Sequence, residues 1–418
     1  MEVVRDPLWS NIRVEPELLA VIDTAVVQRL RYVRQLGHAF LVYPGATHTR
    51  FEHALGTYHL AQRALAHLGE VAGGTAVSPD DGPLVRVAAL LHDIGHYPFS
   101  HALEEAGLPR HEALAERRLA DPALAAALER VGIRPERLLP LIRGTSDAPL
   151  AGLVSGSVDV DKLDYLSRDA MMCGVPYGVI DVERLLASLT LADGAGPGGR
   201  AGLALHEKGL AALESLLFAK YQMYRNVYWH HAVRSATAMF KRLVRTAIAA
   251  GSLRADEVAI ATDDGFSHDL QGTDATGLAA ALRARRLAKR AVEVPAHDLP
   301  PDPAAWPAAD PDLLARVEDR LAREAGLQPG ELLLDFPAKP DLLQVDLPLV
   351  QRDGRLRRDP PLHGVAAELH RAARHLRVFV LRPAVIPARA VVELVMQPAD
   401  AVAARLADGR PLLSRGGP

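Results

Sequence analysis

The sequence of 418 residues has little of several residue types, and each shortage excludes a class of protein. Cys173 is its one cysteine, so no disulfide framework forms within the chain, and a reducing, cytoplasmic location is expected. No run of about 18 uncharged apolar residues occurs, which predicts a soluble protein with no membrane partner. The segment Met1–Pro7 lacks the basic and apolar parts of a secretory signal peptide.

An excess of charge of one sign is also missing. The chain has 48 Lys and Arg residues against 51 Asp and Glu residues, so it lacks the overall basic character typical of nucleic-acid binding. One basic cluster, Arg283–Arg290, stands out. We interpret it as a solvated helix face, with nucleic-acid binding as the alternative that nothing else in the sequence supports.

The residues that are abundant favour helix. Ala, Leu and Arg are common, and all three are good helix formers. Apolar residues recur at helical spacing through the first 250 residues or so. Helices are predicted to begin at Pro16, at Asp23 or Thr24 (ending near Gly37), at Thr49 and after Pro83, and to cover 110–121, 135–143, Asp159–Ala170 and Gly209–Ala250.

Beyond that point the pattern changes. The segment Pro295–Pro311 is rich in Pro and Asp, and three apolar runs favour strands, at 341–349, 376–381 and 390–396. The sequence therefore predicts a mainly α protein. We expect a helical catalytic domain over 1–250, a smaller mixed α/β region for oligomerisation or regulation over 251–405, and a flexible tail over 406–418.

Two adjacent residues, His92 and Asp93, give the first chemical signal. They follow the apolar run Val87–Leu91, and an imidazole beside a carboxylate at a helix end suits a divalent metal ion. His53 lies upstream and Asp161 lies downstream, so four ligands occur in the order His, His-Asp, Asp. A lone helical histidine usually packs or faces solvent, but the ordered set favours a metal site for Mn, Fe, Mg, Co or Zn.

More titratable residues crowd the same segments, namely His96, His101, Glu104 and His111. A bound phosphate needs positive charge around it, and a leaving oxygen needs a proton donor. We assign these tasks to the three histidines. The alternative is that some of them, with Glu104, only orient the residues that act.

Several longer blocks carry a resemblance to a known family. These blocks are Asp23–Gly37, Tyr43–Gly56, Leu90–His101, His111-Glu112, Asp159–Asp169 and Tyr224–His230. They resemble the HD-domain deoxynucleoside triphosphate (dNTP) triphosphohydrolases, in the branch with the vertebrate sterile-alpha-motif and HD-domain enzyme and its bacterial relatives. The resemblance covers most of the chain up to about Ala250 and implies a helical HD-domain core.

The resemblance also implies roles for single residues. His53, His92, Asp93 and Asp161 would bind the metal, and Asp93 with His96, His101 and His111 would form the catalytic group, with His101 as proton donor. Arg50, Lys162 and Arg225, or Lys220 in place of Arg225, would bind the triphosphate. Gln35, Leu36, Tyr165, Asp169 and Tyr228 would surround the deoxyribose and base, and the Tyr165 ring would exclude a ribose 2′-hydroxyl.

The implied reaction is metal-dependent hydrolysis of dNTPs to deoxynucleoside and tripolyphosphate, which lowers or balances dNTP pools. In the resembled branch a guanine nucleotide binds between subunits, and Asp23, Gln28 and Arg31 match positions that contact it. We therefore expect a homo-oligomer, dimer or tetramer, with GTP or a dNTP as regulator. Asp23 as a helix N-cap and Arg31 as a solvated residue are the structural alternatives.

Two other functions remain open from the sequence. One is a different HD phosphohydrolase that acts on nucleoside monophosphates, cyclic dinucleotides or guanosine alarmones. The other is a nucleotide sensor without catalytic activity. The matches at Lys162, Tyr165 and Asp169 argue against the first, and the complete ligand set argues against the second.

Overall fold

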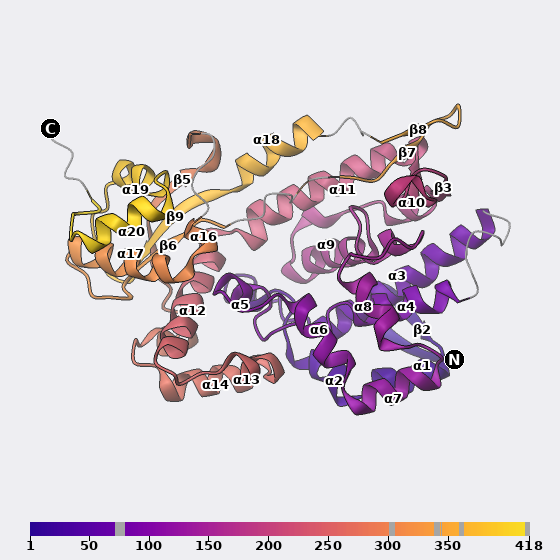
Figure 1. The fold of residues 1–418 in the computed structure, drawn as a ribbon, viewed down its shortest axis with the longest axis horizontal. Helices are drawn as coiled ribbons and strands as arrows, with labels where there is room; N and C mark the ends of the chain where they lie inside the picture. Colours follow the sequence, from indigo (N-terminus) through magenta and orange to yellow (C-terminus); the bar gives the residue numbers. More distant parts are fainter. Residues whose placement is uncertain (72–79, 301–305, 338–342, 344, 359–362, 414–418) are drawn as a thin grey trace.

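A computed structural model describes residues 1–71, 80–300, 306–337, 343, 345–358 and 363–413. As predicted, the fold is mainly α. The described strands form one hairpin and two small sheets, in the orders β1-β2, β3-β4-β7-β8 and β5-β9-β6. Figure 1 shows the N-terminal helices at one end of the molecule and the last helices of the chain at the other.

The N-terminal part is built on three helices that pack together, α3 (Arg50–Val71), α4 (Asp81–Leu91) and α9 (Val160–Cys173). Thr49 begins α3 as part of a capping box, since its backbone N–H donates to the Glu52 carboxylate at 2.6 Å. Asp159 caps α9 by accepting from the Lys162 N–H at 2.8 Å. The caps and the apolar stripes of these helices bring His53, His92-Asp93 and Asp161 to one place.

Shorter elements surround this core. They are β1 (Glu2–Asp6), β2 (Ser10–Val14), α1 (Pro16–Ile22), α2 (Ala25–Gln28), α5 (Ala102–Glu105), α6 (His111–Leu119), α7 (Pro122–Arg130), α8 (Pro135–Ile142), α10 (Val182–Leu186), β3 (Leu189–Ala192) and β4 (Gly202–His206). The helix expected from Asp23 or Thr24 to Gly37 is much shorter, because α2 passes into the 3₁₀ turns η1 (Arg29–Tyr32) and η2 (Gly37–Leu41). Asp23 ends α1 rather than capping α2.

The long helix predicted over Gly209–Ala250 is divided. It consists of α11 (Leu210–Met223), a π-helical turn η7 (Tyr224–Tyr228) and α12 (His231–Ala249). A π turn adds a residue to a helical turn and so redirects the side chains around it, often at functional sites. Here Tyr224 and Tyr228 both line the large cavity described below.

The C-terminal part holds the remaining elements. They are α13 (Ala255–Ile260), α14 (Asp263–Thr273), α15 (Leu278–Arg283), β5 (Lys289–Pro295), α16 (Trp306–Ala309), α17 (Pro311–Glu324), β6 (Leu332–Asp335), β7 (Leu349–Val350), β8 (Leu356–Arg357), α18 (His363–Ala373), β9 (His375–Val380), α19 (Ala388–Val395) and α20 (Ala399–Ala407). The antiparallel sheet β5-β9-β6 has α17, α19 and α20 beside it (Figure 1).

Four expectations for this part were wrong or only partly testable. The run 390–396 forms helix α19, whose Val391, Leu394 and Val395 are buried at helical spacing. Of the run 341–349, residues 341, 342 and 344 lie outside the described residues, and strand β7 begins only at 349. The basic cluster 283–290 is the connection from α15 to β5, not a helix face. In the tail predicted to be flexible, Leu412 is only 1% exposed.

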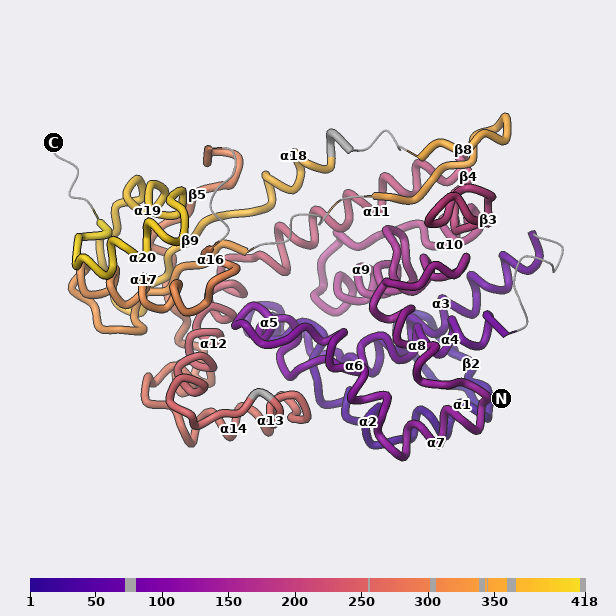
Figure 2. The backbone as a smooth tube through the Cα atoms, viewed as in Figure 1, coloured from indigo at the N-terminus to yellow at the C-terminus, as the bar shows by residue number. Residues whose placement is uncertain are grey.

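The hydrophobic core does not divide cleanly at residue 250. Leu349 belongs to the same core as Ile12 and Val227, because β7 pairs in parallel with β4. Figure 2 shows this late segment lying along the N-terminal part of the molecule. No helix in the described part of the chain is both long enough and apolar enough to cross a membrane.

Candidate metal centre and active site

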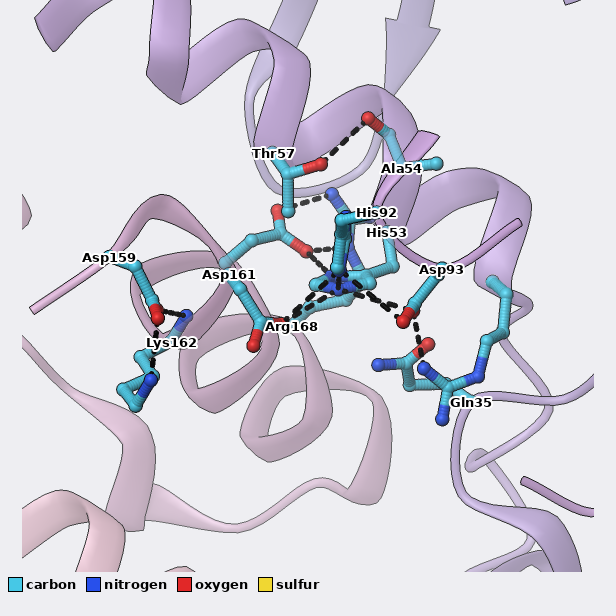
Figure 3. A network of polar contacts seen from close by, with 12 residues as sticks. Gln35, His53, Ala54, Thr57, His92, Asp93, Asp159, Asp161, Lys162 and Arg168 are labelled. Atoms are coloured by element: carbon cyan, nitrogen blue, oxygen red, sulfur yellow. Dashed lines mark hydrogen bonds and ion pairs between the residues drawn. The ribbon is translucent and has the colours of Figure 1, made fainter. Parts of the chain in front are cut away.

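The four predicted ligands lie around one point (Figure 3). His53 Nε2 lies 3.2 Å from His92 Nε2 and 3.0 Å from Asp161 Oδ1. His92 Nε2 lies 3.4 Å from Asp93 Oδ1 and 3.6 Å from Asp161 Oδ1. Donor atoms of two imidazoles and two carboxylates, contributed by three helices, therefore face one another as metal ligands do.

The other ring nitrogen of each histidine is held by a partner. His92 Nδ1 lies 2.8 Å from the Ala89 carbonyl oxygen, and His53 Nδ1 lies 2.8 Å from Asp164 Oδ2. Such partners fix the orientation of a histidine, so that its free nitrogen points at the metal. Sequence reasoning missed Asp164, which the structure shows to be fully buried in α9; its position three residues after Asp161 was the one signal that the sequence offered.

Asp164 is itself held firmly. It accepts hydrogen bonds from Arg168 at 2.9 Å and from the Trp9 indole N–H at 2.5 Å. Arg168 also reaches Asp6 at 2.8 Å. Gly56 leaves room for the Asp164 carboxylate, because a Cβ on residue 56 would lie 1.9 Å from Asp164 Oδ1. The orienting group of His53 therefore depends on the N-terminal hairpin as well as on α9.

The electrostatics of the four residues fit a divalent cation. Burial opposes protonation of His53, but its contacts with Asp161 and Asp164 raise its pKa to about 10. Burial also opposes ionisation of Asp161, yet His53 and His92 hold its pKa well below the usual range. The buried carboxylates thus favour positive charge at this point, and a bound cation supplies that charge when the histidines are neutral ligands.

Arg50 joins the metal centre to the loop that follows α4. Its Nη1 donates to Asp93 Oδ2, and its Nη2 and Nε donate to Ser100 Oγ at 2.9 and 3.2 Å. Ser100 is held in turn by the Gln35 carbonyl oxygen at 2.9 Å, and its φ of 57° is unusual for a residue other than glycine. Sequence reasoning assigned Arg50 to the triphosphate and missed Ser100, which no motif marks.

The three further histidines form a second cluster beside Asp93. Glu104 contacts His111 Nδ1 at 2.6 Å and His101 Nδ1 at 3.2 Å, so it orients both rings. The rings of His96 and His111 stack with centroids 3.8 Å apart, and His96 Nε2 lies 3.4 Å from Asp93 Oδ1. Burial and Arg50 keep the pKa of His96 well below its usual range, so this imidazole is neutral. The His101 side chain is 43% exposed.

Both clusters open into one cavity of about 670 Å³. Its lining includes most residues that the sequence assigned to substrate, namely Gln35, Leu36, Arg50, Lys162, Tyr165, Asp169 and Tyr228. Lys162 is tied to the site wall, because its Nζ donates to Asp159 at 2.6 Å and to the Gly156 carbonyl at 2.8 Å. Burial lowers the pKa of Lys162, but Asp159 and Asp161 outweigh this effect and raise it, so the ammonium remains charged.

Asp169 is a further acidic residue of the cavity lining. Its two carboxylate oxygens contact His48 Nε2 at 2.6 Å and the Tyr228 hydroxyl at 2.7 Å. His48 is a further residue that sequence reasoning did not single out, although it lies within the block Tyr43–Gly56. Nearby, the buried Gln35 Oε1 has no hydrogen-bond partner among the described residues, and the Tyr165 and Tyr228 rings are edge to face. These lining residues offer polar groups and ring faces.

Other predicted residues do not line the cavity. Arg225 is exposed and donates to the Tyr221 hydroxyl, whereas Lys220, its alternative, lines the cavity and is 8% exposed. Asp23, Gln28 and Arg31 also lie outside it. The Gln28 amide donates to the Ile22 carbonyl at 2.9 Å, and Arg31 donates to Gln28 and covers the Phe51 ring.

Known proteins are similar to this chain in sequence and in fold. The model of the HD domain matches residues 50–169, and the model of the HD associated region matches residues 180–384. An uncharacterized protein of Methanocaldococcus jannaschii is 38% identical over 245 residues, which are 58% of this chain and 49% of that protein. Deoxynucleoside triphosphate triphosphohydrolase SAMHD1 of Homo sapiens is 29% identical over 266 residues, 55% of this chain and 42% of that protein. The chain thus spans about half the length of the curated relatives it matches.

Solved structures share the fold over nearly the whole chain. A phosphohydrolase from Bacteroides thetaiotaomicron is 22% identical with a TM-score of 0.71, and the match covers 92% of this chain and 100% of that one. A hypothetical protein from Aquifex aeolicus is 26% identical with a TM-score of 0.69, covering 96% of this chain and 99% of that one. With both family segments present in order and the His, His-Asp, Asp set converging, the chain belongs to the proteins that carry an HD domain followed by an HD associated region.

Proposed function

We propose that this protein is a metal-dependent dNTP triphosphohydrolase, which releases a deoxynucleoside and tripolyphosphate. One observation carries the proposal. The convergent set His53, His92, Asp93 and Asp161 opens into a cavity whose lining combines cations and histidines with ring faces and hydrogen-bonding groups. A nucleotide needs both kinds of contact, cations for its phosphates and rings and polar groups for its sugar and base.

The metal would be held by His53, His92, Asp93 and Asp161. Bound there, a divalent ion would act as a Lewis acid toward phosphate oxygens and lower the pKa of a bound water. The ordered partners of the ligands support this role, since Asp164 and the Ala89 carbonyl fix both imidazoles before any ion binds.

The protein's own cations would bind the triphosphate. Arg50, Lys162 and Lys220 line the cavity and would neutralise phosphate oxygens. His101 would donate a proton to the nucleoside 5′-oxygen as it leaves, since it is the most exposed of the three clustered histidines and Glu104 orients its ring. His96 and His111 would line the part of the cavity that holds the triphosphate, next to His101.

The polar groups and the tyrosine ring in the cavity lining would select the sugar. Asp169, fixed by His48 and Tyr228, would accept a hydrogen bond from the 3′-hydroxyl, with Gln35 as a second polar contact. Tyr165 lies one helical turn from Asp161 on the same face of α9, where its ring would leave no space for a 2′-hydroxyl. The likeness to SAMHD1, whose name states this activity, adds support at 29% identity over half the chain.

A product assay tests the proposal. The purified protein is incubated with each dNTP and with Mg²⁺, Mn²⁺, Fe²⁺, Co²⁺ or Zn²⁺, and deoxynucleoside and tripolyphosphate are measured directly. We expect both products in equal amounts, loss of activity in Asp161→Ala, and full activity in Asp193→Ala, an exposed control in the β3–β4 loop. Formation of deoxynucleoside monophosphate and pyrophosphate, or turnover only of monophosphates, cyclic dinucleotides or alarmones, would overturn it.

Regulation is part of the same proposal. GTP or a dNTP would act through Asp23, Gln28 and Arg31 in a homo-oligomer, so the assay is run with and without GTP while oligomer mass is followed by light scattering. The charge at Arg31 supports an anionic ligand there, since the contacts of its guanidinium are with the neutral Gln28 amide and the Phe51 ring. An Arg31→Gln variant that keeps any GTP response would contradict this assignment.

A further inference from the structure

A second cavity, of about 250 Å³, lies between the loop that carries Phe99 and the helices α12, α14 and α15. Its apolar lining consists of Phe40, Leu41, Phe99, Phe240, Leu243, Leu270, Ala279 and Leu282. Exposed polar residues, among them Asp264, Gln271 and Arg283, stand at its edge. It is therefore an aromatic cavity with a polar entrance.

His38 and Phe99 line both this cavity and the large one. The two rings stack with centroids 4.3 Å apart and planes 7° from parallel, and the Phe240 ring lies 4.8 Å from His38. His38 is only 6% exposed, yet its Nδ1 has no hydrogen-bond partner among the described residues. A buried polar nitrogen without a partner is costly, and that cost is removed when a ligand supplies one.

The ring is also uncharged. Burial and the nearby Arg34 lower the pKa of His38 to about 3. A neutral imidazole pairs with a neutral donor or acceptor, and flat rings suit the surrounding phenyl groups through stacked and edge contacts. The volume is below the roughly 300 Å³ at which pockets for drug-sized ligands begin, so the ligand is small.

We infer that the second cavity is a regulatory site for a neutral heteroaromatic molecule of one or two fused rings, which hydrogen-bonds to His38. The ligand would touch the wall shared with the active site. This inference does not rest on the proposed reaction, because it concerns binding and its linkage to the metal.

The linkage has a short physical route. The Phe99 N–H donates to Asp263 at 2.8 Å, and Phe99 and Ser100 both adopt left-handed φ values, 56° and 57°. Ser100 Oγ accepts from Arg50, whose guanidinium contacts Asp93. A ligand packed on Phe99 changes the stability of this strained turn, and so the position of Arg50 beside a metal ligand.

Matched ligands test the site directly. Benzimidazole has two rings with one donor and one acceptor nitrogen, and indene has the same shape without polar atoms. Calorimetry without metal should show that benzimidazole binds at least about tenfold more tightly than indene, a difference of roughly 1.4 kcal/mol. His38→Phe should remove that preference by weakening benzimidazole and sparing indene. Equal binding of both ligands, or binding of neither, would overturn the site.

Two variants on α14 locate the binding. Ser267→Phe places a ring at the cavity wall, whereas His268→Phe makes the same change on the adjacent exposed residue, which does not line the cavity. Benzimidazole binding should fall at least about tenfold in Ser267→Phe only. Binding that survives in Ser267→Phe would lie elsewhere, in the large cavity for instance, and would contradict the assignment.

The regulatory part is tested by linkage. Saturating benzimidazole should change the Mn²⁺ affinity about fivefold in the wild type, and Mn²⁺ should change benzimidazole affinity by the same factor. Neither change should occur in Ser267→Phe, which also controls for direct complexes of benzimidazole with Mn²⁺. A cavity that binds benzimidazole without any change in Mn²⁺ affinity would be a binding site but not a regulatory one, and the inference would fail.

Discussion

Arg168 and Arg234 are both buried arginines that bind carboxylates from separate parts of the chain, but they serve different ends. Arg168 pairs with Asp164 in its own helix and with Asp6 in the N-terminal hairpin. Arg234, on α12, pairs with Asp335 on β6 at 2.9 Å and with Glu105 on α5 at 2.7 and 3.0 Å. The first network ends on the ring of His53, a candidate metal ligand, whereas the second joins α5 and α12 to strand β6.

The difference shows that a buried arginine–carboxylate pair can either orient a residue of the site or hold two parts of the fold together. In the first network Asp164 has a second task, since it also orients His53. In the second network the carboxylates share a further cation, Lys241, which lies 3.1 Å from Glu105 and 3.5 Å from Asp335. Loss of one arginine should therefore disturb function in the first network, and mainly stability in the second.

Replacing Arg168 with Met should have the largest effect. It leaves Asp164 and Asp6 without their cation in a buried place, which costs about 3–5 kcal/mol. It should also weaken metal binding about 10- to 100-fold, because His53 loses its fixed orientation. Urea denaturation and Mn²⁺ calorimetry measure the two effects. As a matched control, Arg63→Met breaks the more exposed pair with Glu183 and should cost less than about 1 kcal/mol.

Replacing Arg234 with Met should destabilise the fold by roughly 2–4 kcal/mol, somewhat less than the first variant, because Lys241 still compensates Glu105 and Asp335. The affinity for Mn²⁺ should stay within about twofold of the wild type. If this variant lost metal affinity as severely as Arg168→Met, the division between the two networks would be wrong.

The ligand set beside the first network was within reach of the sequence, whereas neither arginine network was. The ordered set His53, His92-Asp93 and Asp161 and the family resemblance predicted the metal site, and composition and helical spacing predicted the mainly α fold. Asp164 escaped because one sequence does not say which of several acidic residues on a helix is buried. Arg234 pairs with Asp335, 101 residues away, and no local pattern encodes such a contact.

Two other errors concern single helices and turns. The π turn at Tyr224–Tyr228 lies between α11 and α12, within a continuous helical pattern, so spacing does not reveal it. The run 390–396 contains three β-branched or bulky residues in a row and was expected as a strand, but its burial follows a helical period in α19. In both cases packing against other elements decides between alternatives that the local sequence leaves open.

Glu318 on α17 adds a pH dependence close to neutral pH beside the second network. Burial raises its pKa to about 7, against the opposing effects of Arg242 and the Leu334 N–H. Because the folded-state pKa is raised, the native state holds this proton more tightly than the unfolded chain does. The associated stability is complete below the unfolded pKa of about 4.5 and is lost as pH rises through about 7, by up to roughly 3 kcal/mol.

The substitution Glu318→Gln tests that dependence, since the amide keeps an acceptor for the Leu334 N–H and cannot ionise. Urea denaturation near pH 5 and pH 8 should show a smaller loss of stability at the higher pH in the variant than in the wild type. An Asp319→Asn control, on the adjacent residue of α17, should leave the wild-type difference in place. An identical pH profile in Glu318→Gln and wild type would contradict the assignment of this titration.

The smallest effect expected separates two cations that the sequence could not rank. Lys220 on α11 lines the large cavity, whereas Arg225 in the π turn points to the Tyr221 hydroxyl and is exposed. A cation that contacts a phosphate contributes about 1.5–3 kcal/mol, so Lys220→Ala should weaken dNTP binding about tenfold or more. Arg225→Ala should change it less than about twofold. Calorimetry with a dNTP analogue that is not hydrolysed measures this binding, and the Asp193→Ala control should bind the analogue as the wild type does. A larger loss in Arg225→Ala than in Lys220→Ala would mean that the π turn rearranges to bring its arginine to the substrate.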